Sequence, residues 1–266
     1  MKKDIVFFDM DGTLTPPRKK FNWSLEPALR DLTQWCEVGI VTGSDYDYLM
    51  EQMGKFLENS PAGYHIHLLP CNGTKWYKPP PYNDQTHKKV YDISMEHYLG
   101  EKPFQELMKV IIKMQNEVSD LNCLTLKGNF IDFRGSTINW CPIGRSSNDK
   151  DRLKFTEYDK KQAFRTRYID RVKIHPKKFG LSEKVAVKKG GETSFDIFPV
   201  GWDKTFALRH FPDWSYWFVG DRCEGSGNDR EIYEACGGQA FKTTGPEATR
   251  DIVYEIMKEL YEKNSD

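Results

Sequence analysis

Two kinds of hydrophobic pattern alternate near the start of the chain. Continuous apolar runs bounded by charge over residues 5–8 and 38–42 predict strands that are buried on both faces of a parallel sheet. Leucines at helical spacing over residues 25–32 predict a helix with Ser24 as its N-cap, and a second helix is expected over residues 44–53. This order of elements is typical of a doubly wound α/β sheet.

The same order of elements returns near the end of the chain. The pattern predicts a helix over residues 203–211, a strand over residues 216–219 and an amphipathic helix over residues 252–260. In a doubly wound sheet, ligands bind beyond the carboxyl ends of the strands. We therefore expect the residues that follow the strands to carry the chemistry.

The segment between these halves has a different pattern. It predicts an amphipathic helix over residues 104–118, a hairpin over residues 130–140, a charged helix over residues 151–172 and a strand pair over residues 185–198. We therefore expect a parallel-sheet core with an inserted α+β cap domain.

We expect the core to consist of residues 1–85 and 200–266, and the cap of residues 86–199. Three consecutive prolines at residues 79–81 precede the insertion, where a stiff segment suits a hinge. The cap segment has an excess of basic residues, which the core balances with acidic ones to a net charge of zero. Basic segments attract phosphate esters and nucleic acids, but the chain has no dense Lys and Arg run, which argues against a nucleic-acid partner.

Composition also bears on location and on metal sites. No apolar run among the 266 residues reaches the roughly 18 residues that span a bilayer, and no secretory signal precedes the first acidic motif. We expect a soluble, cytoplasmic protein with no membrane partner. The six cysteines form no Cys-x-x-Cys pair, and His65 and His67 have no carboxylate at ligand spacing, which argues against zinc.

Carboxylates follow the first predicted strand. Asp9 and Asp11 stand two residues apart, and Gly12 permits a tight turn beside them. A dication at Asp9 needs further oxygen ligands, and Asp221, at the end of another predicted strand, is a candidate. Such a cluster can transfer a phosphoryl group, because one carboxylate attacks phosphorus, a second moves the proton, and a lysine such as Lys204 neutralises charge.

These residues resemble the four motifs of the haloacid dehalogenase (HAD) superfamily. The matching segments are Asp9-x-Asp11-Gly12-Thr13, Thr42-Gly43-Ser44, Lys204, and Gly220-Asp221 through Gly227-Asn228-Asp229. The resemblance implies that Asp9 is the phosphorylated nucleophile and Asp11 the general acid/base. It also implies that Mg²⁺ is held by Asp9, the Asp11 carbonyl and Asp221, with Asp229 as an outer partner of the metal or the lysine.

The same resemblance assigns residues that bind the transferring phosphoryl group. Lys204 is one of them. Either Thr42 or Ser44 is the other, and Thr42 is favoured.

Arginines stand at the ends of predicted strands in the cap segment. They are Arg134, Arg145 and Arg152. Guanidinium groups bind phosphate bidentately and keep their charge. A cluster of them would hold the phosphate that is not being transferred, and solvated surface arginines are the plain alternative.

Long motifs around these arginines resemble the eukaryotic-type phosphomannomutases. The matching segments include Phe-Ile-Asp-Phe-Arg134, Pro-Ile-Gly-Arg145, Gly190-Gly191-x-x-Ser194-Phe195-Asp196 and Gly201-Trp202-Asp203-Lys204, in one order over nearly the whole chain. The resemblance implies that the three cap arginines and Arg18 bind the distal phosphate. It further implies that Ser194 contacts phosphate and that Asp196 contacts sugar hydroxyls.

In that family, mannose 6-phosphate and mannose 1-phosphate interconvert through an aspartyl-phosphate and a hexose bisphosphate. The resemblance therefore implies a hexose phosphate substrate, Mg²⁺, a hexose 1,6-bisphosphate activator, a role in GDP-mannose synthesis, and a homodimer formed through the cap. A HAD-type sugar-phosphate phosphatase is the alternative, because it shares the core residues and differs in how well its cap excludes water. A non-catalytic phosphosugar-binding module is a second alternative.

The chain departs from the family pattern at two positions. Glu192 replaces a residue that is usually apolar, and its charge would weaken phosphate binding if the side chain faced the site. Ala235 replaces an aspartate of a secondary cation site, so that site is not expected here. The preference between mannose and glucose depends on geometry at C2 that the sequence leaves open.

Overall fold

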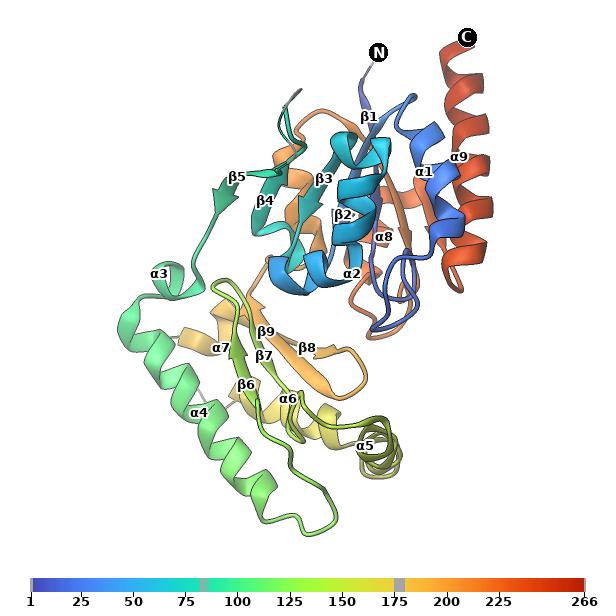
Figure 1. Cartoon of the computed structure of the whole chain (residues 1–266). Helices are drawn as coiled ribbons and strands as arrows, with labels where there is room; N and C mark the ends of the chain where they lie inside the picture. The colour runs from blue at the N-terminus through green and yellow to red at the C-terminus, as the bar shows by residue number, and fades with distance from the viewer. Residues whose placement is uncertain (1, 82–83, 85, 175–179, 266) are drawn as a thin grey trace. The chain divides into compact units, whose positions relative to one another are not determined.

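The computed structural model describes residues 2–81, 84, 86–174 and 180–265. The chain divides into two compact units (Figure 1). The first unit consists of Met1–Asp92 and Asp203–Asp266, and the second unit of Ile93–Trp202. No helix among the described residues combines the length and the apolar character that a membrane crossing requires.

The first unit is built on a mostly parallel sheet with the strand order β11-β10-β1-β2-β3-β4-β5. Its strands are β1 (Asp4–Phe8), β2 (Glu37–Val41), β3 (Ile66–Leu69), β4 (Lys75–Lys78), β5 (Lys88–Asp92), β10 (Ser215–Gly220) and β11 (Ala240–Lys242). Pairing is parallel from β11 to β3 and antiparallel at β4 and β5. The short apolar runs of the sequence therefore form the buried central strands.

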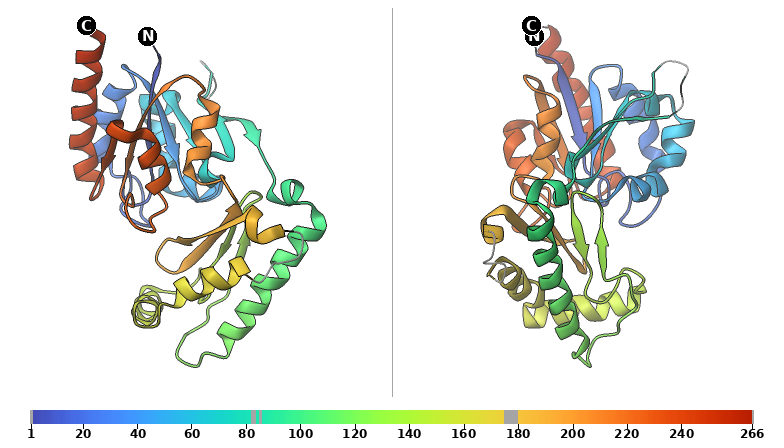
Figure 2. Two further views of the ribbon diagram at one scale, coloured as in Figure 1. Left: turned by 180° about the vertical axis from the view of Figure 1, so that it is seen from behind. Right: turned by 90° about the vertical axis from the view of Figure 1, so that its left-hand side faces the viewer.

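Helices cover both faces of this sheet (Figures 1 and 2). They are α1 (Glu26–Leu32), α2 (Tyr46–Asn59), α8 (Arg230–Cys236) and α9 (Pro246–Ser265), with the 3-10 helices η1 (Trp23–Leu25), η2 (Pro61–His65), η3 (Cys71–Gly73), η5 (Lys204–His210) and η6 (Gly237–Gln239). Val6 and Phe8 pack into the core that includes α1, α2 and α9, whereas Ile5 and Phe7 pack into the core that includes η5 and α8. Successive side chains of β1 thus fill opposite cores, which confirms the predicted doubly wound sheet.

Two local predictions in the first unit need correction. Ser24 is not an N-cap, because Asn22 caps η1 by accepting a hydrogen bond from the Ser24 amide, and α1 begins only at Glu26. The helix expected over residues 203–211 is the 3-10 helix η5, and Asp203 caps it. The helix expected over residues 44–53 is α2, which Asp45 caps and which extends to Asn59.

The second unit begins later than the residue 86 at which we expected it. Strand β5 pairs antiparallel with β4 and so belongs to the large sheet, which moves the division to Asp92 and Ile93. At the other end, Trp202 is the last residue of the second unit. Residues 79–81 consequently lie between two strands of one sheet and are not a hinge between the units.

The second unit is an antiparallel sheet with helices. The strand order is β6-β7-β9-β8, from β6 (Ile131–Phe133), β7 (Ile138–Trp140), β8 (Val185–Gly190) and β9 (Ser194–Pro199). The helices are α3 (Met95–Leu99), α4 (Glu101–Ser119), α5 (Asp149–Gln162), α6 (Phe164–Ile174) and α7 (Leu181–Lys184). Trp140 on β7 donates a hydrogen bond to Gln115 on α4 and packs against Tyr168 on α6, so one face of the sheet is covered by these helices.

The predicted helix over residues 151–172 is two helices. Ala163 separates α5 from α6 in a left-handed conformation with φ of 47°. Asp159 stabilises the break, because its carboxylate accepts hydrogen bonds from the backbone amide and the guanidinium of Arg165, both at 2.7 Å. A local ion pair across the break therefore stabilises a bend within a sequence that otherwise favours helix.

Candidate active site

The acidic residues of the first unit meet at the carboxyl ends of two neighbouring strands. Asp9 follows β1 and Asp221 follows β10, and these strands pair in register at Phe8 and Val219. Asp229 stands just before α8. Ligand oxygens of the three aspartates lie within 4.8 Å of one another.

Lys204 joins two of these carboxylates. Its ammonium donates hydrogen bonds to Asp9 and to Asp229, and the Lys204 and Asp229 side chains are both fully buried. Burial alone would lower the pKa of Lys204, but Asp229 and Asp9 outweigh it and raise the pKa above the ordinary value for lysine. The second oxygen of Asp229 accepts from the Arg222 backbone amide at 3.0 Å, so Asp229 acts through Lys204 and the loop after β10.

The cluster has an excess of negative charge. Burial, Asp229 and Asp221 raise the pKa of Asp9 and Lys204 lowers it, and the balance of these effects brings the pKa to about 8. The pKa of Asp221 is raised by burial and by Asp229. Three carboxylates share one ammonium, so a bound dication would restore the ionised form of Asp9.

Two features of the cluster fit a dication. Asp221 Oδ1 is buried and has no hydrogen-bond partner, as expected of an oxygen reserved for a ligand. Gly12 has φ of +89°, and a Cβ there would lie 2.4 Å from Asp221 Oδ2, so only glycine lets this carboxylate approach the loop after β1. Hard oxygen donors of this kind suit Mg²⁺.

The Asp11 side chain is oriented differently from the three grouped aspartates. Asp11 Oδ1 accepts hydrogen bonds from the Arg18 backbone amide at 2.9 Å and from the Tyr48 hydroxyl at 3.3 Å. Arg18 has a left-handed φ of 61° and contributes its backbone to this contact. These two contacts hold the Asp11 carboxylate, and Asp11 is not among the aspartates whose oxygens are grouped.

Thr42 lies directly after β2, the strand next to β1. It is buried, and its hydroxyl accepts a hydrogen bond from the Ser44 amide at 3.1 Å. The backbone amide of Asn72 donates to the Thr42 carbonyl at 2.8 Å, which anchors the strand end. Thr42 thus stands at the same edge of the sheet as Asp9, and Ser44 supports it.

In the second unit, Asp132 on β6 connects two of the predicted arginines. Its Oδ2 accepts from Arg134 Nε at 3.1 Å and lies 3.8 Å from Arg145 Nη1. The Arg134 side chain is only 4% exposed, so it is not a solvated surface arginine. Arg145 remains about a third exposed.

Asn139 on β7 connects Arg145 to the other predicted residues. Its Oδ1 accepts from Arg145 Nη1 at 3.1 Å, while its Nδ2 donates to Asp196 Oδ1 at 2.7 Å and to Ser194 Oγ at 3.1 Å. The structure therefore brings Arg134, Arg145, Ser194 and Asp196 into one polar cluster.

Arg152 joins this cluster through the turn after β8. Its Nη1 donates to Thr193 Oγ1 at 2.8 Å, and its Nη2 donates to the Arg145 carbonyl at 3.0 Å. Thr193 is buried, whereas the neighbouring Glu192 is exposed. In this turn, Arg152 thus donates to Thr193. Within the described part of the chain, Glu192 accepts no hydrogen bond from Arg145 or Arg152.

The comparisons with known proteins agree with this geometry. A family model for eukaryotic phosphomannomutase matches residues 25–259. The chain is 32% identical over 261 residues to a probable phosphomannomutase of Caenorhabditis elegans, covering 97% of each chain. It is 34% identical over 248 residues to a phosphomannomutase of Dendrobium officinale, covering 93% of this chain and 91% of the relative.

The chain belongs to the eukaryotic phosphomannomutase family. This membership confirms the resemblance that the motifs carry, and it makes the chain an enzyme of an isomerase family. The fold is also similar to that of an N-terminally truncated Plasmodium falciparum IMP-nucleotidase, with a TM-score of 0.66 and 17% identity over 96% of this chain and 70% of that one. That likeness supports the HAD-like fold class.

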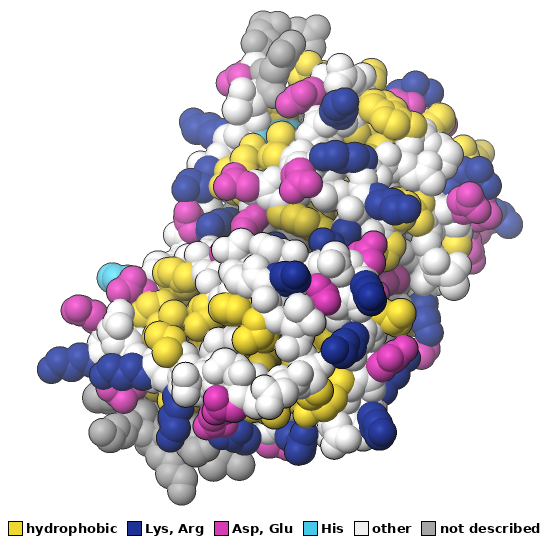
Figure 3. Space-filling model, turned by 60° about the horizontal axis from the view of Figure 1, so that its bottom comes forward, with side chains coloured by type: hydrophobic (Ala, Val, Ile, Leu, Met, Phe, Trp, Pro, Cys, Tyr) yellow, Lys and Arg dark blue, Asp and Glu magenta, His cyan; other side chains and the backbone are white. Residues whose placement is uncertain are grey.

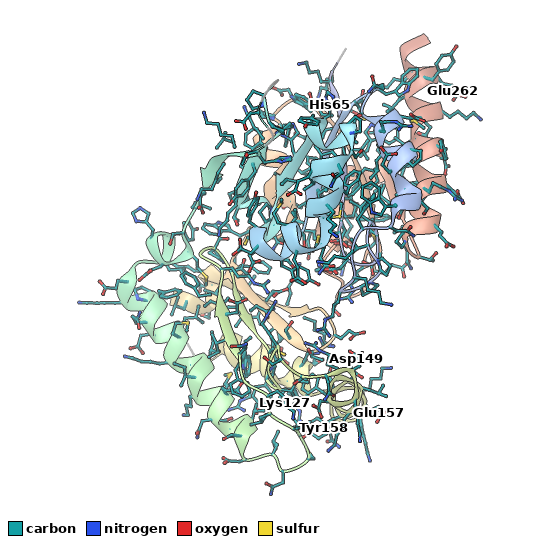
Figure 4. The ribbon with its side chains drawn as sticks, viewed as in Figure 1. His65, Lys127, Asp149, Glu157, Tyr158 and Glu262 are labelled. Carbon is teal, nitrogen blue, oxygen red and sulfur yellow. The ribbon has the colours of Figure 1, made fainter. Side chains whose placement is uncertain are left out.

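Several residues of this phosphomannomutase-family site carry no signal in the sequence. Asn139 is a single amide within a hydrophobic hairpin, and Tyr48 is one aromatic residue on an amphipathic helix. By contrast, the charged segment Glu157–Lys161 is one of the sequence motifs that resemble the family; Glu157 and Tyr158 lie on α5 (Figure 4), and Asp159 is buried. Arg165 completes this group by pairing with Asp159 and donating to the Gly191 carbonyl at 3.1 Å.

Proposed function

We propose that the chain interconverts mannose 6-phosphate and mannose 1-phosphate through an aspartyl-phosphate at Asp9 and a hexose bisphosphate intermediate. The observation that carries the proposal is the contact of Lys204 with Asp9 and Asp229 beside Asp221. This arrangement positions one carboxylate, one ammonium and a dication ligand around a single point. Those are the groups that phosphoryl transfer to a carboxylate requires.

Asp9 is the nucleophile of the proposed reaction. One carboxylate oxygen of Asp9 attacks phosphorus of a hexose 1,6-bisphosphate, the bond from phosphorus to the ester oxygen breaks, and a hexose monophosphate leaves. Lys204 balances negative charge on the transferring group, and Thr42 or Ser44 donates a hydrogen bond to it. Mg²⁺, held by Asp9, Asp221 and the Asp11 carbonyl, would supply further neutralisation of that charge.

Asp11 moves the proton. It protonates the departing ester oxygen and, in the reverse step, accepts the proton of the sugar hydroxyl that attacks phospho-Asp9. Tyr48 and the Arg18 amide hold its carboxylate in place. In both directions, the phosphoryl group therefore moves between Asp9 and the sugar, and the proton moves between Asp11 and the same sugar oxygen.

The second unit is proposed to bind the phosphate that is not being transferred. Its guanidinium groups are suited to the two charges of a phosphate monoester. Ser194 would donate to the same phosphate, and Asp196 would accept hydrogen bonds from sugar hydroxyls. Each phosphate of the bisphosphate takes both positions in turn, which makes the product an isomer of the substrate.

A product assay tests this proposal against the phosphatase alternative. The full chain is incubated with mannose 1-phosphate, Mg²⁺ and a catalytic amount of glucose 1,6-bisphosphate, and products are followed by phosphorus NMR. We expect mannose 6-phosphate with little inorganic phosphate. Inorganic phosphate without mannose 6-phosphate would overturn the mutase and favour the phosphatase.

A parallel assay tests the second alternative, that the chain is a non-catalytic phosphosugar-binding module. If wild type converts nothing and Asp9→Asn binds mannose 1-phosphate as tightly as wild type, the chain is a sugar-phosphate binder instead.

We also propose that the mannose 1-phosphate formed by the chain supplies GDP-mannose synthesis.

We further propose that two copies of the chain pair through the second unit. Ile112 on α4 is 55% exposed and Phe133 on β6 is 40% exposed, and Phe133 packs against Phe104 with ring centroids 4.9 Å apart. Hydrophobic side chains also gather on part of the surface in Figure 3. Sedimentation of Ile112→Glu tests the pairing: a shift toward monomer is expected, and an unchanged wild-type dimer would place the interface elsewhere.

A further inference from the structure

Asn139 occupies the centre of a row of polar residues across the second sheet. It is the cross-strand partner of Asp132 on β6 and of Asp196 on β9, and Asp196 in turn is the partner of Lys188 on β8. Partners directly opposite one another in a sheet project from the same face. The neighbouring Ile138 and Trp140 are buried on the other face, so Asn139 belongs to the polar one.

We propose that Asn139 is a positioning residue that keeps Arg145 and Asp196 apart and orients both toward a hexose phosphate. The inference rests on the proposed function, since it assigns Arg145 to the phosphate and Asp196 to the sugar hydroxyls.

The amide of Asn139 satisfies both partners at once. A guanidinium can only donate and an ionised carboxylate can only accept, so Arg145 must face Oδ1 and Asp196 must face Nδ2. Asn139 is 4% exposed, so its amide oxygen and nitrogen depend on these protein partners for their hydrogen bonds. The orientation of the amide is thereby fixed by its partners.

Without this amide, the two charged groups have a competing arrangement. Arg145 and Asp196 carry opposite charges on neighbouring segments, and direct pairing would use the guanidinium and carboxylate groups that the substrate needs. Asn139 uses one hydrogen-bonding position of each and leaves the remaining ones for the sugar phosphate. An aspartate at position 139 would repel Asp196, and a serine is too short to reach both partners.

The Asp196 carboxylate is also confined from its other side. A Cβ at Gly190 would lie 2.6 Å from Asp196 Oδ2, so the carboxylate rests directly on the Gly190 backbone. Ser194 Oγ donates to the Gly190 carbonyl at 2.7 Å and accepts from Asn139. Without the Asn139 amide, the Asp196 carboxylate would therefore be free to move toward Arg145.

The test measures binding without turnover. In an Asp9→Asn parent with Mg²⁺ present, the affinity for mannose 1-phosphate is measured by titration calorimetry for the parent, Asn139→Leu and Asn139→Ser. We expect the dissociation constant to rise at least tenfold in both variants. Thr137→Val is the matched control, because it removes a buried hydroxyl nearby that has no hydrogen-bond partner, and its affinity should stay within twofold.

A second readout separates positioning from a purely structural role. With Asp9 intact, Asn139→Ser should raise KM for mannose 1-phosphate at least tenfold, while hydrolysis of the small ester p-nitrophenyl phosphate stays within twofold. Equal loss of both activities, or unchanged affinity in the calorimetry, overturns the inference. If the Asp9→Asn parent itself binds no mannose 1-phosphate, the proposed function fails, and the inference fails with it for that separate reason.

Discussion

The Lys204 ammonium donates a hydrogen bond to Asp9 across 195 positions of sequence. It thereby links the start of the chain to the segment that follows the second unit, and the contact to Asp229 extends the link to α8. Each of the three side chains depends on the others for charge compensation, because all are buried. The charges of this cluster therefore govern both the stability of the first unit and its chemistry.

Lys204→Met should destabilise the protein and abolish its activity. The substitution leaves Asp9 and Asp229 buried without a counter-charge, and breaking a buried ion pair from one side costs about 3–5 kcal/mol. Urea unfolding measures the loss. The double variant Lys204→Met with Asp229→Asn removes one of the stranded charges and should recover at least half of the lost stability, although it stays inactive. A double variant no more stable than the single one would contradict the assignment.

Gly12→Ala should raise the Mg²⁺ concentration needed for half-maximal activity by about tenfold or more, since the new Cβ would displace the Asp221 carboxylate. Gly237→Ala is the matched control, because Gly237 also has a positive φ, of +57°, but no atom lies within 4 Å of its Cβ position. Both variants should lose about 1–3 kcal/mol of stability from backbone strain. Only Gly12→Ala should change the Mg²⁺ requirement, and equal requirements would show that the close approach to Asp221 is unimportant.

The grouping of Asp9 with Asp221 could be predicted because both aspartates follow recognisable strands. Residues 5–8 and 216–219 are apolar runs buried in a sheet, so Asp9 and Asp221 had to emerge at one edge, and the structure groups their oxygens. Lys204 was a weaker prediction from the residues alone, because a lysine that follows such a turn is more often a solvated surface charge, and the resemblance to a family added the decisive support. Its position on a 3-10 helix and its full burial arise from tertiary contacts that periodicity does not encode.

The second unit was less accessible to prediction. The helix break at Ala163 contains no glycine or proline from which it could be predicted. It is stabilised by the ion pair between Asp159 and Arg165. Asn139 is separated by more than fifty residues from Asp196, and register across β7 and β9 brings them together. The cytoplasmic location, the metal and the pairing of two copies stay predictions.

His87 should make stability depend on pH. It is buried and hydrogen-bonded to the Ile66 carbonyl at 2.9 Å, and burial lowers its pKa, with a smaller effect of His67 in the same direction. The folded state thus binds its proton less readily than the unfolded state. Stability is complete above the unfolded pKa of 6.5 and is lost as pH falls below it, by at most about 1.4 kcal/mol per pH unit.

Urea unfolding at several pH values checks this expectation. His87→Asn should flatten the decrease below pH 6.5, although His210, whose pKa is also lowered by burial, keeps part of it. His65→Asn serves as the control, because His65 is exposed, and it should leave the slope unchanged. A slope in His87→Asn equal to that of wild type would exclude His87 as a source.

Thr193→Val should weaken the use of hexose phosphates moderately. Valine has nearly the same shape but offers no acceptor to Arg152 Nη1, and one such hydrogen bond to a charged group contributes about 1.5–3 kcal/mol at most. We expect kcat/KM for mannose 1-phosphate to fall about threefold to thirtyfold, mainly through KM. Glu192→Gln should change it less than twofold, because Glu192 is exposed. A larger fall of kcat/KM in Glu192→Gln than in Thr193→Val would show that Glu192, and not Thr193, is the residue of this turn that affects substrate use.

Detection of a phosphoryl group on Asp9 is the most direct test of the proposed mechanism. The full chain with Mg²⁺ is mixed with glucose 1,6-bisphosphate that carries labelled phosphorus, quenched in acid and digested, and the labelled peptide is identified by mass spectrometry. We predict label on the peptide that contains Asp9, its absence in Asp9→Asn, and its transfer to sugar when mannose 1-phosphate is added before the quench. Label that never reaches Asp9, or that passes only to inorganic phosphate, would contradict the account.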